Sequence, residues 1–425
     1  MPDEFAAACA ALGIETTSES RQVHYHRARA VSGAVVQDWD VADTTLRLLW
    51  PVPGAEVSIQ EVAALTFAVD HVVSVDSTEF DPQLRLFTAT GDPAGAPTWA
   101  QLATVIGRIP YWPTRLRVFE VIRHWRPGAV AATVAPIPAV DLAPAGRLAA
   151  ILPAGSPARR VVDRVMVEAL ASAAADTRDE VNRLSAETWA RVLDIAAIPL
   201  DISGEALPES VAWQGWCDIM ERADDLSASL VREAGWVWTT AWRPFEAIDD
   251  IDPDSVTGAA WAEQLVPVRR ECQPAKFEMV RDPDPTNEET EHLVDPYTGV
   301  PAIRYHSRRL RYAAPASLPT DSPLTEVVLD HQQIWIRDGN GVLYPAPRVG
   351  PVWGLLGYGH KGGRAHTLAV LLDRLLTDIG APGASPSDTT EAASAGLLTV
   401  TETTWPDRTV ISRAKLETAA ATRGD

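Results

Sequence analysis

Cysteine and long apolar runs are scarce in this chain. The three cysteines, Cys9, Cys217 and Cys272, lie far apart without a Cys-x-x-Cys pair, so the sequence predicts neither a disulfide framework nor a zinc knuckle. No apolar run reaches the roughly eighteen residues of a membrane-spanning helix. The N-terminus lacks the basic segment and apolar core of a secretory signal. These absences predict a soluble, cytoplasmic protein with no membrane partner.

Signatures of known catalytic machinery are also missing. The chain contains no Gly-x-Ser-x-Gly nucleophile elbow, no His-Glu-x-x-His metal motif and no kinase signature set. Acidic pairs such as those in residues 249–254 are expected by chance in a chain with 57 acidic residues. The sequence therefore assigns no catalytic residue, no cofactor and no metal site, and it leaves open whether the protein is an enzyme.

Basic residues are fewer than acidic residues, 37 against 57. The formal net charge is −20, and the 425 residues are 46% apolar and 22% charged, as in an ordinary globular protein of two or three domains. Because nucleic-acid binders usually carry a basic footprint, this charge argues against nucleic acid as a partner. Abundant Ala, Arg, Pro and Trp with little Lys is typical of a GC-rich genome, and we expect a bacterial source.

Three regions follow from the change of pattern along the chain. Residues 1–134 alternate helical and extended patterns, residues 150–235 are helical, and residues 236–425 are rich in strands. A proline-rich run at residues 135–144 separates the first two regions. The predicted fold is therefore a mixed α+β or α/β protein with a helical middle region and a β-rich C-terminal region.

Individual elements are predicted from capping and turn signals. Capping boxes at Ser58 and Thr177 predict helices that begin there, and Thr98 is the predicted cap of a helix over Trp99–Ile109. Asp-Gly and Asn-Gly turns predict a hairpin over Ile334–Tyr344. Further predicted helices are Ser58–Val72, Ser156–Ala174 and Trp213–Glu233. Further predicted strands are Thr45–Val52, Leu84–Thr90, Leu116–Trp125, Trp236–Trp242, Val327–Leu329, Val352–Leu356, Leu397–Glu402 and Thr409–Ile411.

The segment Gly357–Arg364 is the strongest candidate for a binding site. It contains four glycines and the basic side chains of His360, Lys361 and Arg364, and it leads into an apolar helical stripe that ends near Ile379. A strand, a glycine loop and a helix in this order resemble an anion cradle, because free backbone N–H groups and the helix dipole favour negative charge. The candidate ligand-binding residues are Gly359, His360, Lys361, Gly362, Gly363 and Arg364, with His360 tuning affinity near neutral pH.

Named phosphate motifs do not fit this loop. Walker A places its lysine after the second glycine and before a hydroxyl residue, whereas Lys361 precedes the glycine pair. Gly357, Gly359 and Gly362 match Gly-x-Gly-x-x-Gly, but no βαβ unit with an acidic ribose ligand follows. A tight structural turn therefore stays open as the alternative.

Two function classes remain for the chain. In the first, the loop binds an anionic small molecule, a phosphorylated ligand or a protein partner. In the second, the protein is a non-enzymatic structural or interaction protein, such as a mobile-element or phage-related assembly component, and forms a homo-oligomer. The second class fits a local likeness: Trp353–Leu372 is similar to a glycine-aromatic motif of uncharacterised bacterial proteins, some on mobile elements, which implies no activity.

Two other windows are weaker candidates. His24 and His26 alternate along a predicted strand and would share one face, but the sequence supplies no third metal ligand, so an exposed edge strand is the alternative. Arg304–Tyr312 is the most basic window, and its arginines either bind phosphate or balance the acidic stretch before it. The acidic run Asp282–Glu291 shows no metal-ligand spacing.

Overall fold

The structure is a computed structural model that describes residues 4–15, 22–63, 69–77, 82–186, 191–236, 248–282, 284, 286–349, 356–384 and 393–422. The chain divides into two compact units. Unit 1 comprises residues 1–140 and 167–204, and unit 2 comprises residues 141–166 and 205–425. The three-region boundaries expected from the sequence stay a prediction, but the mixed α/β class is confirmed, with an N-terminal sheet, a helical middle and β-rich C-terminal sheets.

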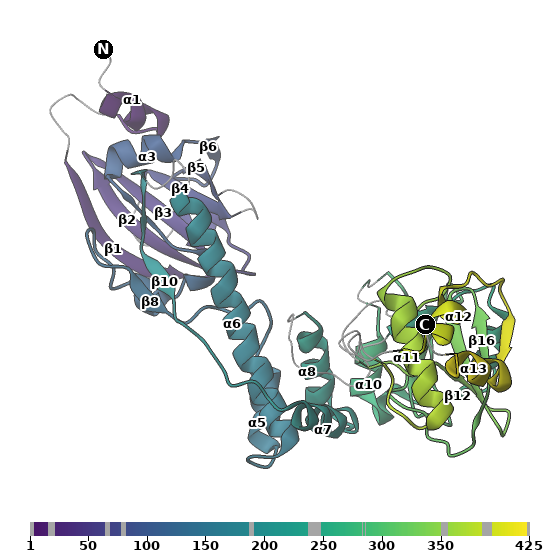
Figure 1. Ribbon diagram of the computed structural model, residues 1–425. Coiled ribbons are helices and arrows are strands. Elements are labelled where there is room, and N and C mark those ends of the chain that lie inside the picture. Colours follow the sequence, from purple (N-terminus) through teal and green to yellow (C-terminus); the bar gives the residue numbers. More distant parts are fainter. Residues whose placement is uncertain are drawn as a thin grey trace. The chain divides into compact units, whose positions relative to one another are not determined.

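Unit 1 is built on a six-stranded sheet with the strand order β1-β2-β3-β4-β5-β6 (Figure 1). All neighbouring strands are antiparallel except β3 and β4. The central strands β2 and β3 are almost entirely buried because apolar residues point to both faces of the sheet. The strands are β1 (Val23–Val31), β2 (Ala34–Val41), β3 (Thr44–Pro51), β4 (His71–Ser77), β5 (Pro82–Thr88) and β6 (Pro93–Gly95).

Short helices and two small parallel strand pairs complete unit 1. The cap predicted at Thr98 is confirmed and is a full capping box, since its side chain accepts from Gln101 N and the Gln101 side chain accepts from Thr98 N. The predicted strand over Leu116–Trp125 is wrong, because Leu116, Ile122 and Trp125 reach the core from a 3-10 turn and a short helix. These elements are α1 (Glu4–Ala11), α2 (Ile59–Ala63), α3 (Trp99–Ile106), β7 (Ile109–Tyr111), η1 (Thr114–Leu116), α4 (Phe119–Ile122), β8 (Ala132–Val134), β9 (Leu193–Ile195) and β10 (Ala197–Pro199).

A single 30-residue helix, α6 (Pro157–Ala186), replaces the two helices predicted on either side of Thr177. The capping-box residues serve other contacts. The Thr177 hydroxyl is buried and donates to Ala173 O within the helix, and the Glu180 carboxylate accepts from the Tyr111 hydroxyl at 2.6 Å. The helix therefore continues, because the Thr177 hydroxyl is bonded within the helix and Glu180 is engaged by Tyr111, so neither side chain forms a cap.

Unit 2 contains a helical cluster and two antiparallel sheets. Helices α5 (Ala143–Ile151), α7 (Glu209–Met220), α8 (Asp225–Trp236) and α10 (Pro274–Val280) pack with the start of α6 around Trp216. The five-stranded sheet has the order β11-β15-β14-β13-β12, and the four-stranded sheet has the order β18-β17-β16-β19. The first sheet consists of β11 (Ile248–Ile251), β12 (Val266–Pro267), β13 (Glu289–Val294), β14 (Pro301–Tyr305) and β15 (Leu310–Ala313), with α9 (Val256–Ala262) and η3 (Arg270–Cys272) in its connections.

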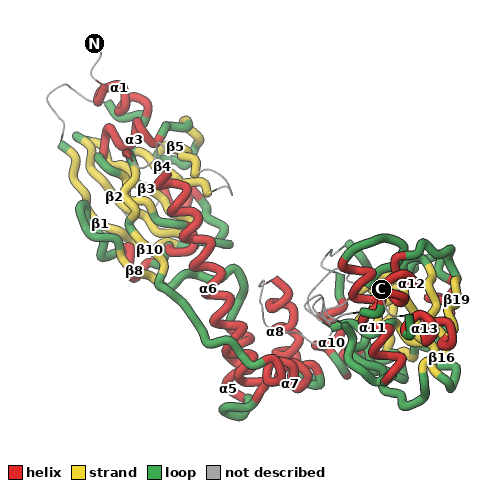
Figure 2. The backbone as a smooth tube through the Cα atoms, in the orientation of Figure 1, coloured by secondary structure: helices red, strands yellow, loops and turns green. Residues whose placement is uncertain are grey.

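The four-stranded sheet packs against three C-terminal helices (Figure 2). The predicted hairpin is confirmed as β17 and β18, and the predicted strand Leu397–Glu402 is wrong because it is a helix capped by Ser394, with Leu397 and Thr401 buried four residues apart. These elements are β16 (Leu324–Asp330), β17 (Gln333–Asp338), β18 (Leu343–Pro345), α11 (Gly363–Thr377), α12 (Ala395–Glu402), β19 (Thr409–Ser412) and α13 (Arg413–Ala420).

Some predicted features lie elsewhere or cannot be compared. Two strands are expected over Trp236–Trp242 and Val352–Leu356, and most residues of each lie outside the described residues. The α11 helix ends at Thr377, and its C-cap residue Asp378 is extended. Among the described residues, no helix has both the length and the apolar composition needed to span a bilayer.

Candidate functional site

The glycine loop leads directly into α11, as the sequence predicts. His360, Lys361, Gly362, Gly363 and Arg364 are exposed, and Gly359 is half-buried. Gly362 is the N-cap residue of α11, and no side chain caps the helix there. The first amides of α11 thus point away from the helix body beside two exposed cationic side chains.

Part of the glycine content is explained by the backbone of the loop. Gly359 has a φ of 85° and Gly362 a φ of 148°, a region that favours glycine. A Cβ on Gly357 would lie 3.3 Å from the Arg364 Cβ, so the loop folds back on its own end. Gly363 is different, because it is helical and a Cβ there would meet open space.

The loop is tied to neighbouring segments of unit 2. Gly359 N donates to Thr401 O at 2.9 Å, and the Thr404 hydroxyl donates to Gly359 O at 3.1 Å. The Tyr358 side chain is buried, and its hydroxyl accepts from Gln332 N at 3.2 Å. Gln332 belongs to the turn between β16 and β17, so the loop adjoins a part of the sheet that the sequence did not single out.

That turn carries a histidine in an uncommon backbone conformation. His331 and Gln332 have φ values of 48° and 61°, and they connect the paired residues Asp330 and Gln333. Positive φ at both central residues is the geometry of a type I′ hairpin turn, where Asn-Gly is preferred. A histidine and a glutamine here are strained, at a cost of about 1–3 kcal/mol each.

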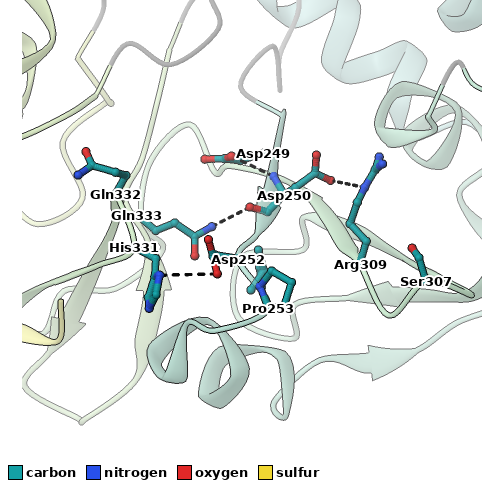
Figure 3. Close-up of a pocket in the computed structure, with 10 residues that line it drawn as sticks. Asp249, Asp250, Asp252, Pro253, Ser307, Arg309, His331, Gln332 and Gln333 are labelled. Atoms are coloured by element: carbon teal, nitrogen blue, oxygen red, sulfur yellow. Dashed lines mark hydrogen bonds and ion pairs between the residues drawn. The ribbon is translucent and has the colours of Figure 1, made fainter.

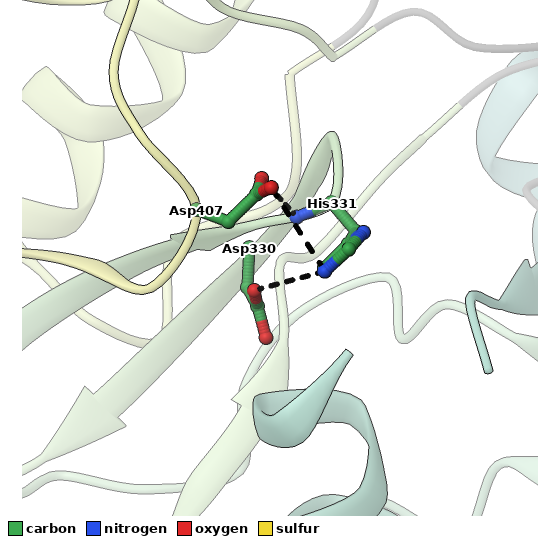
Figure 4. Close-up of side chains that lie close together, drawn as sticks. All are labelled: Asp330, His331 and Asp407. Carbon is green, nitrogen blue, oxygen red and sulfur yellow. Dashed lines mark hydrogen bonds and ion pairs between the residues drawn. The ribbon is translucent and has the colours of Figure 1, made fainter. Parts of the chain in front are cut away.

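The His331 imidazole lies among carboxylates. Its Nδ1 is 3.6 Å from Asp252 Oδ1 (Figure 3). Its Nε2 is 3.9 Å from both Asp330 Oδ1 and Asp407 Oδ2 (Figure 4). Asp407 also anchors the turn, because its Oδ1 accepts from His331 N at 2.9 Å. The ring is therefore surrounded by negative groups from three separate segments.

Asp330 is fully buried at the end of β16. Its Oδ2 accepts from the Ser255 hydroxyl and from Thr257 N, both at 2.9 Å. Burial alone would raise the pKa of this carboxyl, but these two donors and His331 more than offset the burial and lower it. Asp330 is thus held as a carboxylate, and among the described residues its Oδ1 has no hydrogen-bond partner.

A cavity of about 510 Å³ opens beside this histidine (Figure 3). Gln333 lines the cavity, and its Nε2 donates to Asp250 O at 2.9 Å. The Oε1 of Gln333 is buried and has no hydrogen-bond partner among the described residues. Arg309 lies at the other end and donates to Asp250 Oδ1 at 2.9 Å. The lining residues are Asp249, Asp250, Ile251, Asp252, Pro253, Ser307, Arg309, His331, Gln332 and Gln333.

Three of the polar side chains that line the cavity are carboxylates, Asp249, Asp250 and Asp252. The Arg309 guanidinium is already engaged by Asp250 and Asp282, and Arg348 pairs with Asp249 at 2.9 Å. The remaining carboxylate, Asp252, faces His331. The cavity therefore suits a cation better than an anion, unlike the exposed glycine loop.

The other sequence candidates make ordinary charge contacts. His24 and His26 lie on the edge strand β1 with ring centroids 5.3 Å apart, and His26 Nε2 pairs with Asp40 at 2.5 Å. In the basic window, Arg304 pairs with Glu291 at 2.8 Å. Arg309 and Arg311 pair with Asp250 and Asp282. These pairings match the interpretation of the window as a charged face that balances the acidic stretch before it.

Comparison with known protein families, with curated proteins and with solved structures gives no match for this chain.

Proposed function

We propose that unit 2 binds an anionic, phosphorylated ligand at the loop Gly357–Arg364. The observation that supports this proposal is the start of α11 at Gly363 without a side-chain cap, beside the exposed side chains of Lys361 and Arg364. Uncapped amides at a helix N-terminus attract anions, and two cations add charge-assisted hydrogen bonds. The proposed function is binding, without an assigned reaction.

Each part of the loop has a distinct proposed role. Gly362 and Gly363 leave the amides accessible because neither has a side chain, and Gly359 supplies the turn that brings the loop to the helix. Lys361 and Arg364 neutralise the ligand, and His360 is exposed beside them.

The experiment compares two double variants in a binding assay. Inorganic pyrophosphate and ATP are titrated into the wild type, into Lys361→Ala with Arg364→Ala, and into Arg147→Ala with Arg269→Ala. Arg147 and Arg269 are exposed and lie outside the loop, so the second variant changes the net charge equally. Loss of two charge-assisted bonds should weaken binding at least tenfold, or about 1.4 kcal/mol, in the first variant only.

The competing class is a structural or interaction protein that forms homo-oligomers, in which the loop is only a tight turn. Static light scattering on the same samples separates the two classes. A defined oligomer that binds neither pyrophosphate nor ATP contradicts the anion site. Binding that both double variants weaken equally would mean that bulk charge, rather than the loop, attracts the anion.

A further inference from the structure

We infer that Asp330, His331 and Asp407 form a binding site for a divalent first-row transition cation, of the Zn²⁺ class, at the turn between β16 and β17. Among the described residues, this is the group of three His, Cys, Asp or Glu side chains whose ligand atoms all lie within 4.8 Å of one another. The site is separate from the exposed glycine loop and needs no ligand there.

The buried carboxylate of Asp330 distinguishes this group from a chance cluster of surface acids. A carboxylate oxygen that is removed from water and left without a donor costs free energy, so a fully buried one calls for a partner. Asp330 is 0% exposed, its Oδ2 is saturated by Ser255 and Thr257, and its Oδ1 is directed toward His331 with no partner among the described residues. A cation between Asp330 and His331 would satisfy that oxygen.

The imidazole of His331 is oriented as in a metal site. Ligating histidines usually turn one ring nitrogen to the metal and the other to a carboxylate or carbonyl. Here Nε2 faces Asp330 and Asp407, and Nδ1 faces Asp252 at 3.6 Å. Asp252 is therefore the positioning residue for the ring and lies on the cavity side (Figure 3).

The separations require little movement. Donor atoms bound tetrahedrally at about 2.1 Å from one Zn²⁺ are about 3.4 Å apart. The Nε2 of His331 is 3.9 Å from each of the two carboxylate oxygens. A shift of about half an ångström brings each carboxylate oxygen to ligand spacing from Nε2. The Asp407 side chain is 53% exposed and is held through its Oδ1, which accepts from His331 N, so its Oδ2 is the oxygen that would move.

The donor set indicates the class of cation. One imidazole nitrogen and two carboxylate oxygens suit Zn²⁺, Co²⁺ or Mn²⁺, whereas Ca²⁺ and Mg²⁺ prefer oxygen alone. Three protein ligands leave a coordination position open, as in catalytic rather than structural zinc sites.

The test uses the full chain without an affinity tag, treated with EDTA and then desalted. ZnCl₂ is titrated by isothermal calorimetry, and CoCl₂ by visible absorption, which reports the coordination geometry. The wild type should bind a single equivalent of either ion, and Zn²⁺ should raise its melting temperature. His331→Asn should weaken binding at least tenfold, a magnitude typical even of outer ligands of a metal site.

Three further variants make the result decisive. Asn is among the residues most often found at positive φ, so His331→Asn keeps the turn and removes only the imidazole. Asp330→Asn and Asp407→Asn should weaken binding as well, whereas Asp254→Asn, an exposed acid in the same loop as Asp252, should leave it unchanged. Equal affinity in the wild type and His331→Asn, or no binding of Zn²⁺, Co²⁺ or Mn²⁺ by the wild type, would overturn the site and mean that His331 only neutralises its acidic neighbours.

Discussion

The hydroxyl of Tyr358 accepts a hydrogen bond from the backbone amide of Gln332 at 3.2 Å, and this contact joins the glycine loop to the histidine turn. Tyr358 is buried, and burial raises the pKa of its phenol. The hydroxyl therefore stays neutral at physiological pH. The two candidate sites of unit 2 thus share a buried connection through one side chain.

Tyr358→Phe should destabilise the protein by about 1 kcal/mol, because the Gln332 amide loses its acceptor in a partly buried hydrogen bond. Urea unfolding followed by tryptophan fluorescence measures this change. Tyr297→Phe is the matched control, since Tyr297 is 49% exposed and its hydroxyl reaches water. Equal stability of Tyr358→Phe and wild type would mean that the Gln332 amide finds another acceptor.

Two glycines of the loop should respond in opposite directions to alanine. Gly359→Ala should cost about 1–2 kcal/mol, because an L-residue at a φ of 85° is strained. Gly363→Ala should stabilise by about 0.5–1 kcal/mol, because this helical position has open space and alanine loses less entropy on folding. Thermal unfolding of both variants checks the pair. A loss of stability in Gly363→Ala would show that its backbone or surroundings are tighter than the structure has them.

Local signals were enough to predict the elements around the loop. The hairpin of β17 and β18 follows from its turn residues, because the Asp338 side chain accepts from Asn340 N and Val342 N within the same turn. The α11 helix follows from its apolar stripe, which packs against the four-stranded sheet. The hairpin depends on hydrogen bonds between residues close in sequence, and the helix depends on apolar residues that recur with the helical period.

The acidic cluster could not be predicted in this way. Asp407 is 76 positions from His331, and Asp252 lies on a third segment. Only the Asp330-His331 pair is adjacent in sequence, and such a pair has no metal-ligand spacing by itself. The sheet register and the connection between α12 and β19 bring these residues together, and no local sequence pattern predicts either of them. The same applies to the capping box predicted at Thr177, whose Glu180 is engaged by Tyr111, 69 positions away.

A buried ion pair in unit 1 should be sensitive to the loss of one partner. The Arg47 side chain is 0% exposed. Its Nε donates to Asp38 Oδ1 and its Nη1 donates to Val62 O, both at 2.7 Å. Asp38→Asn leaves the guanidinium buried without a counter-charge and should destabilise by about 3–5 kcal/mol. Arg47→Met combined with Asp38→Asn should recover part of this loss, because no buried charge remains.

The exposed pair Arg413 and Glu417 is the control for that experiment. Its members are four residues apart on α13, with side chains 35% and 53% exposed. Glu417→Gln should change the free energy of unfolding by about 0.5 kcal/mol or less. Urea unfolding of the four proteins gives both values. A similar small effect for Asp38→Asn would mean that water reaches Arg47.

Glu278 should make stability depend on acid pH. Its side chain is 1% exposed and pairs with Arg232 at 3.0 Å, and Arg270 and Arg281 also contact it. Burial alone would raise the pKa of this carboxyl, but the hydrogen bonds from Arg232 and the charges of the three arginines outweigh burial and lower it. Because the folded-state pKa lies below the unfolded value of about 4.3, the ionised group stabilises the fold above that pH, and this stabilisation is lost as pH falls through the folded-state pKa.

Glu278→Gln isolates this contribution. The variant should be less stable than the wild type at pH 7, because Arg232, Arg270 and Arg281 each lose the ion pair with the Glu278 carboxylate. The difference should shrink as pH falls from the unfolded-state value of about 4.3 through the lowered folded-state pKa of Glu278, where the wild-type carboxyl also becomes neutral. Urea unfolding of both proteins at a series of pH values measures the difference. The pKa values of Asp224, Asp282 and Asp330 are lowered as well, so both proteins weaken in acid, and only the difference between them reports on Glu278. A difference that stays constant with pH would mean that Glu278 has an ordinary pKa despite its arginines.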